Sequence, residues 1–213
     1  MSWITDHIQT VDESLFIPRI LHLVWVGPPI PTEVSKHIDQ WKLLMPEWCI
    51  RVWRDEDINS ENFPPDIVEK INLCEKNAQK ADIMRYFIVE KHGGMYVDCD
   101  MKPNRSLEPL RFMRADFLIC HDNTITWQFI INAFFAATPH HPIMKQACEC
   151  ARQTTINVGD IAQFTGPGLL GVAVQMTPPV DGRKALVLPH YYFYVNDNHV
   201  DRFAQHLYWH SWT

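Results

Sequence analysis

The sequence lacks the features that define several large classes of protein. Its 213 residues contain 19 lysines and arginines against 25 aspartates and glutamates, which gives a formal net charge of −6. This balance argues against a nucleic-acid partner and against a surface for anionic membranes. No apolar run approaches the roughly 20 residues that cross a bilayer, and residues 1–8 show no targeting pattern. We therefore expect no membrane span and place the protein in the cytoplasm.

Cysteine motifs and phosphate-binding loops are also missing. The six cysteines form no C-x-x-C pair and no spacing typical of a disulfide framework, so we interpret them as free thiols in a reducing compartment. The segment Thr-Gly-Pro-Gly at residues 165–168 does not match the phosphate-binding loop G-x-x-x-x-G-K-[ST]. With 46% hydrophobic residues, the chain has enough apolar side chains for one domain with a substantial core.

Apolar periodicity and breaker residues predict strands that alternate with helices. We expect strands at residues 20–26, 49–53, 95–97, 116–120, 185–188 and 190–195, and helices at 32–45, 64–74, 78–92, 143–152 and within 159–175. Both faces of the first strand are mostly apolar, as in a central strand of a parallel sheet. The alternation indicates an α/β fold with a mainly parallel central sheet flanked by helices.

One stretch, residues 78–101, organises the rest: AQKADIMRYFIVEKHGGMYVDCDM. Apolar residues recur there at helical spacing, namely Ile83, Met84, Phe87 and Ile88. The pair Gly93-Gly94 ends the helix, because glycine takes the positive φ of a helix C-terminus without strain. A short buried strand then leads to two carboxylates, Asp98 and Asp100, with Cys99 between them.

Asp98 and Asp100 form the clearest candidate site. Residues i and i+2 of an extended chain point to one side, so the two carboxylates repel unless a proton, a basic side chain or a cation lies between them. A divalent ion that also holds a diphosphate, Mg²⁺ or Mn²⁺, is the natural partner. The alternative is a solvated pair in a turn. The buried strand before the pair, together with Asp82 and Arg85 on the preceding helix, favours the metal site.

Residues 81–100, ADIMRYFIVEKHGGMYVDCD, resemble the sugar-nucleotide-binding region of DXD glycosyltransferases of family 32 and, more distantly, the glucosylating domain of large clostridial toxins. Four further segments match in family order and extend the resemblance over nearly the whole chain: IPRILHLVWVG, INAFFAATPHHP, TGPG and HLYWHSW. The compact form resembles glycosyltransferase domains of chlorella (algal) viruses, which implies a viral protein.

The resemblance implies a GT-A (nucleotide-diphospho-sugar transferase) fold and one domain over residues 1–213. Its donor-binding half would cover about 18–102, and its acceptor side with a C-terminal lid about 103–213. The implied activity is a metal-dependent transfer, with retention of configuration, from a UDP-sugar to a glycan or protein acceptor such as a glycoprotein. The implied cofactor is Mn²⁺ or Mg²⁺. We expect a monomer or a part of a larger polypeptide.

The resemblance also assigns donor contacts to individual residues. Trp25, with Val26 beside it, would hold the uracil ring, although a tryptophan at this position also suits the core. Asp82 would accept from a ribose or sugar hydroxyl, and Arg85 would meet the sugar or the diphosphate. At positions i and i+3, these two residues also suit a purely structural ion pair. Asn132 would either contact the donor sugar or cap a turn.

The C-terminal segment HLYWHSWT is unusual, because charged and flexible tails are the norm. The family has a histidine-aromatic-Ser-Trp ending that folds over the diphosphate and completes the metal shell. The expected metal ligands are Asp98, Asp100 and His210, with His206 as the alternative to His210. Ser211 and Trp212 would donate to phosphate oxygens. The alternative is a packed aromatic terminus without a function.

Within this hypothesis, Asp98, Asp100 and Arg85 form the catalytic set, because the metal and the guanidinium neutralise the charge of the departing diphosphate. Cys99 would contribute to donor binding, and the acceptor hydroxyl would enter from the side of Asp122, Asn132 and Thr165–Gly168. The sequence points to no nucleophile and no base. Two other functions stay open: an inactive nucleotide- or carbohydrate-binding scaffold, and a metal-dependent phosphohydrolase, which usually needs further carboxylates and a basic groove.

Overall fold

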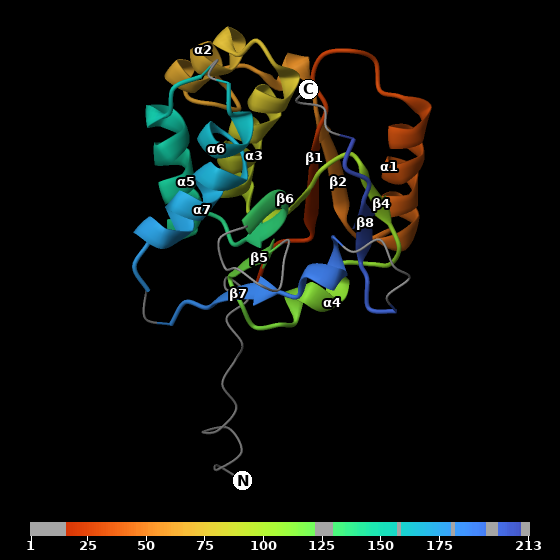
Figure 1. Cartoon of the computed structure of the whole chain (residues 1–213). Helices are drawn as coiled ribbons and strands as arrows, with labels where there is room; N and C mark the ends of the chain where they lie inside the picture. Colours follow the sequence, from red (N-terminus) through yellow and green to blue (C-terminus); the bar gives the residue numbers. More distant parts are fainter. Residues whose placement is uncertain (1–15, 122–129, 157–158, 180–181, 195–199, 210–213) are drawn as a thin grey trace.

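The computed structural model describes residues 16–121, 130–156, 159–179, 182–194 and 200–209. Over these ranges the chain forms a six-stranded sheet in the order β2-β1-β3-β6-β5-β7 and a separate pair of strands, β4 and β8 (Figure 1). The strands are β1 (Ile20–Val24), β2 (Cys49–Trp53), β3 (Gly94–Val97), β4 (Met101–Pro103), β5 (Phe117–His121), β6 (Ile130–Ala137), β7 (Ala185–Leu188) and β8 (Ala204–His206). The helices are α1 (Thr32–Leu44), α2 (Pro65–Leu73), α3 (Asn77–His92), α4 (Glu108–Arg111), α5 (Pro142–Gln153), α6 (Ile161–Phe164) and α7 (Pro167–Met176).

Within the described sheet, β6 is the strand that runs against its neighbours. The pairs β1–β2, β1–β3 and β5–β7 are parallel, whereas β6 pairs antiparallel with β3 and with β5. The start of β6 therefore lies beside the end of β3, where Val97 is paired with Phe134. The backbone N–H of Asp98 donates to the carbonyl of Ala133 at 2.9 Å. This direction brings the first residues of β6 to the edge where β1 and β3 end.

Alternating side chains of the sheet build two cores, one on each face. On β3, Met95 and Val97 pack with α1, α4 and residues 193–194 and 203–204, whereas Tyr96 packs with α2, α3, α5 and α7. Helices cover both faces in Figure 1, as expected for a sheet whose central strands are apolar on both sides. Each fully buried large apolar side chain contributes roughly 1.5–3 kcal/mol relative to an exposed one.

The turn between α3 and β3 requires its two glycines. Helix α3 ends at His92, its C-cap residue Gly93 has a φ of 63°, and Gly94 follows with a φ of 95°. A Cβ atom on Gly94 would lie 2.6 Å from the carbonyl oxygen of Ile20 on β1. A side chain at this position would therefore separate β3 from β1 as well as strain the backbone. The turn sets the direction of β3 and so places Asp98 at its end.

Most of the expected elements are confirmed, and the differences lie in the second half of the chain. The α/β class and the mainly parallel sheet are as expected. The strand expected at 190–195 is wrong, because residues His190–Tyr192 form a 3₁₀-helix. The helical segment expected within 159–175 is divided into α6 and α7 at Thr165-Gly166. No helix in the described ranges is long and apolar enough to cross a membrane.

A buried histidine on strand β1, His22, predicts that the free energy of unfolding depends on pH. His22 is 1% exposed, accepts from the indole N–H of Trp53 at 3.1 Å through Nδ1, and lies 2.9 Å from the carbonyl oxygen of Gly93 through Nε2. Burial lowers the pKa of His22 from 6.5 to about 4. Its neutral form is thus favoured in the folded state. The contribution of His22 is complete above pH 6.5 and is lost as the pH falls towards 4.

We expect this single group to lower the free energy of unfolding by about 3 kcal/mol between pH 7 and pH 4, since one pKa unit corresponds to about 1.4 kcal/mol. Urea unfolding at half-unit pH intervals measures the effect. A His22→Gln variant is the control, because it keeps a polar side chain but has no titration in this range. Parallel pH profiles for the two proteins would contradict the prediction.

Candidate active site

A cavity of about 330 Å³ opens where β1 and β3 end and β6 begins. Its lining includes every described residue that we predicted for the donor or the metal: Trp25, Val26, Asp82, Arg85, Asp98, Cys99, Asp100, Asn132 and His206. A larger hollow of about 460 Å³ is lined by residues 60–64, α3 and α5. Among its cationic side chains, Arg152 pairs with Asp66 and Lys91 donates to the carbonyl of Glu61. None of the described donor or metal candidates lines this hollow, so the candidate site is the smaller cavity.

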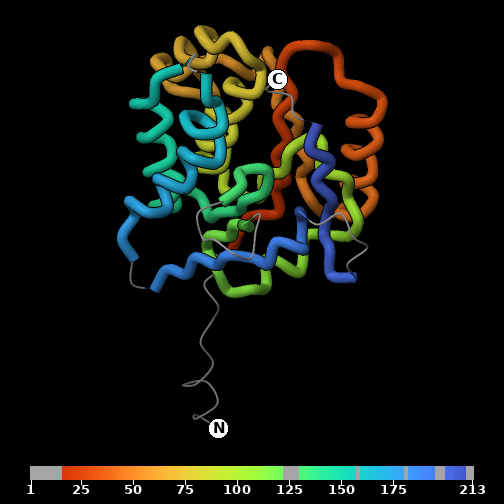
Figure 2. Tube along the Cα trace, viewed as in Figure 1, coloured from red at the N-terminus to blue at the C-terminus, as the bar shows by residue number. Residues whose placement is uncertain are grey.

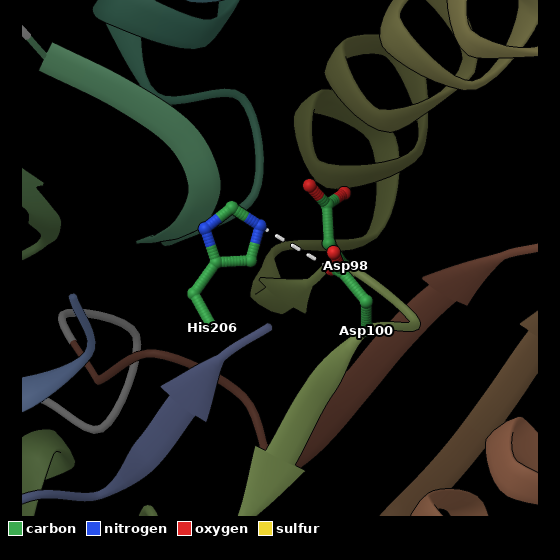
Figure 3. Close-up of side chains that lie close together, drawn as sticks. All are labelled: Asp98, Asp100 and His206. Atoms are coloured by element: carbon green, nitrogen blue, oxygen red, sulfur yellow. Dashed lines mark ion pairs between the residues drawn. The ribbon is translucent and has the colours of Figure 1, made fainter. Parts of the chain in front are cut away.

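Two acidic side chains and one histidine converge at the mouth of this cavity (Figure 3). Asp98 follows β3, Asp100 precedes β4, and His206 ends β8. Because β4 pairs with β8, with Met101 opposite His206, the imidazole is carried to the two carboxylates. Figure 2 shows the blue C-terminal segment alongside the green segment of β4. One potential ligand atom from each of the three side chains lies within 4.8 Å of the others. The arrangement can hold a metal ion.

Asp100 anchors the last described residues of the chain. Its Oδ1 lies 3.3 Å from Nε2 of His206, and its Oδ2 accepts from the backbone N–H of Trp209 at 3.0 Å. The Leu207 N–H donates to the Asp100 carbonyl. Burial alone would raise the pKa of Asp100, but the hydrogen bonds from His206 and Trp209 hold that pKa below its ordinary value. Asp100 is therefore a charged candidate ligand, and it also holds the last described residues of the chain in place.

The structure brings one of the two candidate histidines to the carboxylates. His206, which we treated as the alternative ligand, is the described histidine in the cluster. The preferred His210, together with Ser211 and Trp212, lies outside the described residues, and so does Asp122 of the expected acceptor side. Their roles stay predictions.

Arg85 connects the two halves of the site. Its guanidinium lies 3.0 Å from Asp82 and 3.1 Å from Asp98, and it donates to the carbonyl of Asn132 at 2.8 Å. The side chain is 6% exposed and lies over the ring of Tyr96. Burial would lower the pKa of Arg85, but the charges of Asp98, Tyr96 and Asp82 raise it above the ordinary value. The expected ion pair with Asp82 is present, and both of its members also line the cavity.

Asp82 is a buried carboxylate with three donors. Besides Arg85, it accepts from the amide of Asn132 at 2.8 Å and from the hydroxyl of Thr165 at 3.1 Å. Burial raises the pKa of Asp82 to about 6, against the lowering effect of Arg85. The carboxylate is therefore ionised at neutral pH. An ionised carboxylate has about four acceptor positions, so Asp82 can accept a further hydrogen bond from a ligand. Arg85 donates to the carbonyls of Ala81 and Asn132 and forms ion pairs with Asp82 and Asp98. Asp82 and Arg85 both line the cavity and can therefore face a hydroxyl-bearing ligand.

Trp25 and Cys99 differ in what they offer to the cavity. The indole N–H of Trp25 donates to the carbonyl of Pro28 at 2.8 Å, which fixes the orientation of a half-buried ring. The thiol of Cys99 donates to the carbonyl of Val24 at 3.3 Å and is buried. Burial raises the pKa of this thiol, so it stays protonated. Trp25 can stack on a flat ligand, whereas the Cys99 thiol has a structural contact.

Sequence reasoning missed or misplaced three polar groups of the site. Tyr96 donates to Asp98 at 2.7 Å, and Tyr86, which we included in an apolar stripe, contacts Asn132 at 3.1 Å. Thr165, which we expected on the acceptor side, is fully buried and donates to Asp82. Likewise, Asn132 lies within β6 and does not cap a turn. A tyrosine in an apolar stripe is a usable signal, because a buried phenol needs a hydrogen-bond partner.

The sheet topology and the cavity at its carboxyl edge define the GT-A class of α/β fold. The solved structure of the PaToxG glycosyltransferase superposes with a TM-score of 0.63 at 16% identity and covers 76% of this chain and 72% of its own. The UDP-bound glycosyltransferase domain from the YGT toxin superposes with a TM-score of 0.51 at 10% identity, covering 75% of this chain and 77% of its own. At these identities the likeness shows the fold alone.

Sequence comparison links part of the chain to one family. Residues 31–118 match the family model described as "Glycosyltransferase sugar-binding region containing DXD motif". Inositol phosphoceramide mannosyltransferase 1 of Schizosaccharomyces pombe is 31% identical over 153 residues. The match covers 69% of this chain and 46% of that protein, so the chain spans about half the length of this relative.

Proposed function

We propose that the chain is a metal-dependent glycosyltransferase that transfers a sugar from a nucleotide-diphosphate sugar to an acceptor hydroxyl. The observation that carries this proposal is the convergence of Asp98, Asp100 and His206 beside Arg85, inside a cavity of the DXD family region. The resemblance to retaining enzymes of family 32 makes retention of configuration part of the proposal. We also propose that residues 1–213 form a single domain.

The residues at the cavity mouth fit a divalent cation of the Mn²⁺ or Mg²⁺ type. Carboxylate oxygens suit both ions, and an imidazole nitrogen favours Mn²⁺ of the two. Asp98 and Asp100 would be the carboxylate ligands, and His206 would be the nitrogen ligand, with His210 as the alternative. When bound, such an ion supplies positive charge to the diphosphate as it leaves the sugar.

The other side chains of the cavity would bind and orient the donor. Trp25 would stack on the base next to Val26. The Asp82 carboxylate and the Arg85 guanidinium, which both line the cavity, would bind a sugar hydroxyl. Arg85 would also add positive charge near the departing diphosphate, because its guanidinium already lies 3.1 Å from Asp98. Ser211 and Trp212 would add donors to phosphate oxygens.

Two similarities bear on the identity of the donor and of the acceptor. The UDP-bound toxin domain and the stacking position of Trp25 favour a UDP-sugar. The relative at 31% identity is named a mannosyltransferase of inositol phosphoceramide, which favours a mannosyl donor and a polar lipid acceptor. We propose a UDP-sugar donor with a glycan or protein acceptor first, and a mannosyl donor with a polar lipid acceptor second.

Metal removal tests the proposal. Isothermal titration of UDP and of GDP is carried out with Mn²⁺ and then with EDTA. We expect UDP affinity to fall by more than about tenfold in EDTA, since the cation bridges carboxylates and diphosphate. A preference for GDP would keep the transferase and select the second donor. Nucleotide affinity that is equal with Mn²⁺ and with EDTA would contradict the metal site and favour a scaffold. Release of phosphate from a simple phosphoester would favour the phosphohydrolase.

A further inference from the structure

A fully buried hydrogen-bond network lies behind the donor-sugar side of the cavity. Tyr86 on α3 and Thr165 in the turn between α6 and α7 are both 0% exposed. The Thr165 hydroxyl donates to Oδ2 of Asp82 at 3.1 Å, and the Asn132 amide donates to Oδ1 of Asp82 at 2.8 Å and to the Tyr86 hydroxyl at 3.1 Å. The network therefore joins α3, β6 and the α6–α7 turn around one carboxylate.

The α6–α7 turn is held in place by the same tyrosine. The Tyr86 hydroxyl lies 2.8 Å from the carbonyl oxygen of Thr165 and 2.9 Å from that of Gly166. A Cβ atom on Gly166 would lie 3.0 Å from the Cα of Ala162, so the turn is also closely packed against α6. The Thr165 backbone has little freedom, and its hydroxyl is presented to Asp82 from a fixed position.

We propose that Thr165 is a positioning residue, whose hydroxyl, held by Tyr86, orients the Asp82 carboxylate towards a hydroxyl of the donor sugar. This inference rests on the proposed function. Thr165 does not line the cavity, so it acts through Asp82 and does not contact the donor.

The physical reason lies in the geometry of a carboxylate. The terminal torsion of an aspartate is broad, so hydrogen bonds must set the direction of its free lone pairs. Arg85 and Asn132 both act on Oδ1, and Thr165 is the described donor to Oδ2. The Thr165 hydroxyl also lies 3.2 Å from the carbonyl of Ile161, but the charged oxygen is the stronger acceptor. Without the hydroxyl, Oδ2 loses its fixed partner and Asp82 can rotate.

The test compares Thr165→Val, which keeps the shape and removes the hydroxyl, with Thr165→Ser, which keeps the hydroxyl. Thr177→Val is the matched control, because Thr177 donates only to the carbonyl of Ala173 at the far end of α7. Dissociation constants with Mn²⁺ are measured for UDP, GDP, UDP-glucose, UDP-galactose, UDP-N-acetylglucosamine and GDP-mannose. The readout is the affinity of the best nucleotide sugar relative to that of its own nucleotide.

We expect Thr165→Val to weaken this relative affinity by about tenfold, as for the loss of one hydrogen bond at a charged group. Nucleotide affinity should be unchanged, which also shows that the variant is folded. Thr165→Ser and Thr177→Val should behave as the wild type. Two results would overturn the inference and leave the nucleotide site intact. One is an unchanged relative affinity in Thr165→Val. The other is a wild type that binds UDP or GDP but no nucleotide sugar of the panel. A wild type without metal-dependent nucleotide binding would instead remove the proposed function and this inference together.

Discussion

Replacing Asp100 with alanine is expected to lower the Mn²⁺-dependent affinity for UDP by about a hundredfold or more, since it removes a charged metal ligand. The same carboxylate contacts His206 and the Trp209 N–H. The variant therefore loses a ligand, the contact that orients the imidazole, and the clamp on the tail. Titration calorimetry with Mn²⁺ and with EDTA measures the loss.

Two further variants separate these effects. Asp100→Asn keeps an acceptor for the Trp209 N–H but removes the charge, so it should lose the metal dependence and retain the position of the tail. Asp201→Ala is the control. It removes an exposed carboxylate that pairs with Arg105 and does not line the cavity, so UDP binding should be unchanged. Wild-type UDP affinity that remains sensitive to EDTA in Asp100→Ala would mean that the cation binds elsewhere.

Local sequence rules were sufficient for the stretch that carries the carboxylates. The apolar spacing of α3, the glycines at 93 and 94 and the strand before Asp98 are all short-range signals, and the structure has each of them where expected. The positive φ of Gly93 is a consequence of ending a helix in one residue. For this reason the position of Asp98 at a strand end was predictable without knowledge of the remaining fold.

The partners of this stretch depended on pairings between distant segments. Asn132 reaches Asp82 because β6 runs antiparallel to β3 in one register, in which Val97 is paired with Phe134. His206 reaches Asp100 because β8 pairs with β4. A three-residue strand such as β8 has no periodic signal of its own. The choice between His206 and His210 therefore could not be made from the sequence.

Polar groups in apolar surroundings were the hardest to assign. Tyr86 fits the apolar stripe of α3 by spacing, yet its hydroxyl joins the network around Asn132 and the Thr165-Gly166 turn. Thr165 was assigned to the acceptor side because the resembled family has a Thr-Gly-Pro segment there. Its full burial follows from the packing of α7 against α5 and β6 and of α6 against α7, which is a property of the whole fold.

Replacing Arg85 with methionine is expected to lower the free energy of unfolding by about 3–5 kcal/mol, the range for breaking a buried ion pair on one side. Arg85 neutralises Asp82, which is 2% exposed, and also contacts Asp98. Its removal leaves a buried carboxylate without a cation. Urea unfolding at pH 7 measures the loss. Arg152→Met is the control, because Arg152 pairs with Asp66 at the surface, where such pairs contribute about 0–1 kcal/mol.

A double-mutant cycle tests the assigned cause. If the loss comes from an uncompensated charge on Asp82, then Asp82→Asn, which removes that charge and keeps the shape, should recover part of the stability of Arg85→Met. The double variant should therefore be more stable than the sum of the two single losses predicts, by about 0.5–3 kcal/mol, as for residues in direct contact. Additive losses would mean that the packing of Arg85 over Tyr96 matters more than its charge. One further outcome is a double variant that recovers stability and still binds nucleotide sugars weakly. That result would show that the Arg85–Asp82 pair serves ligand binding at a cost in stability.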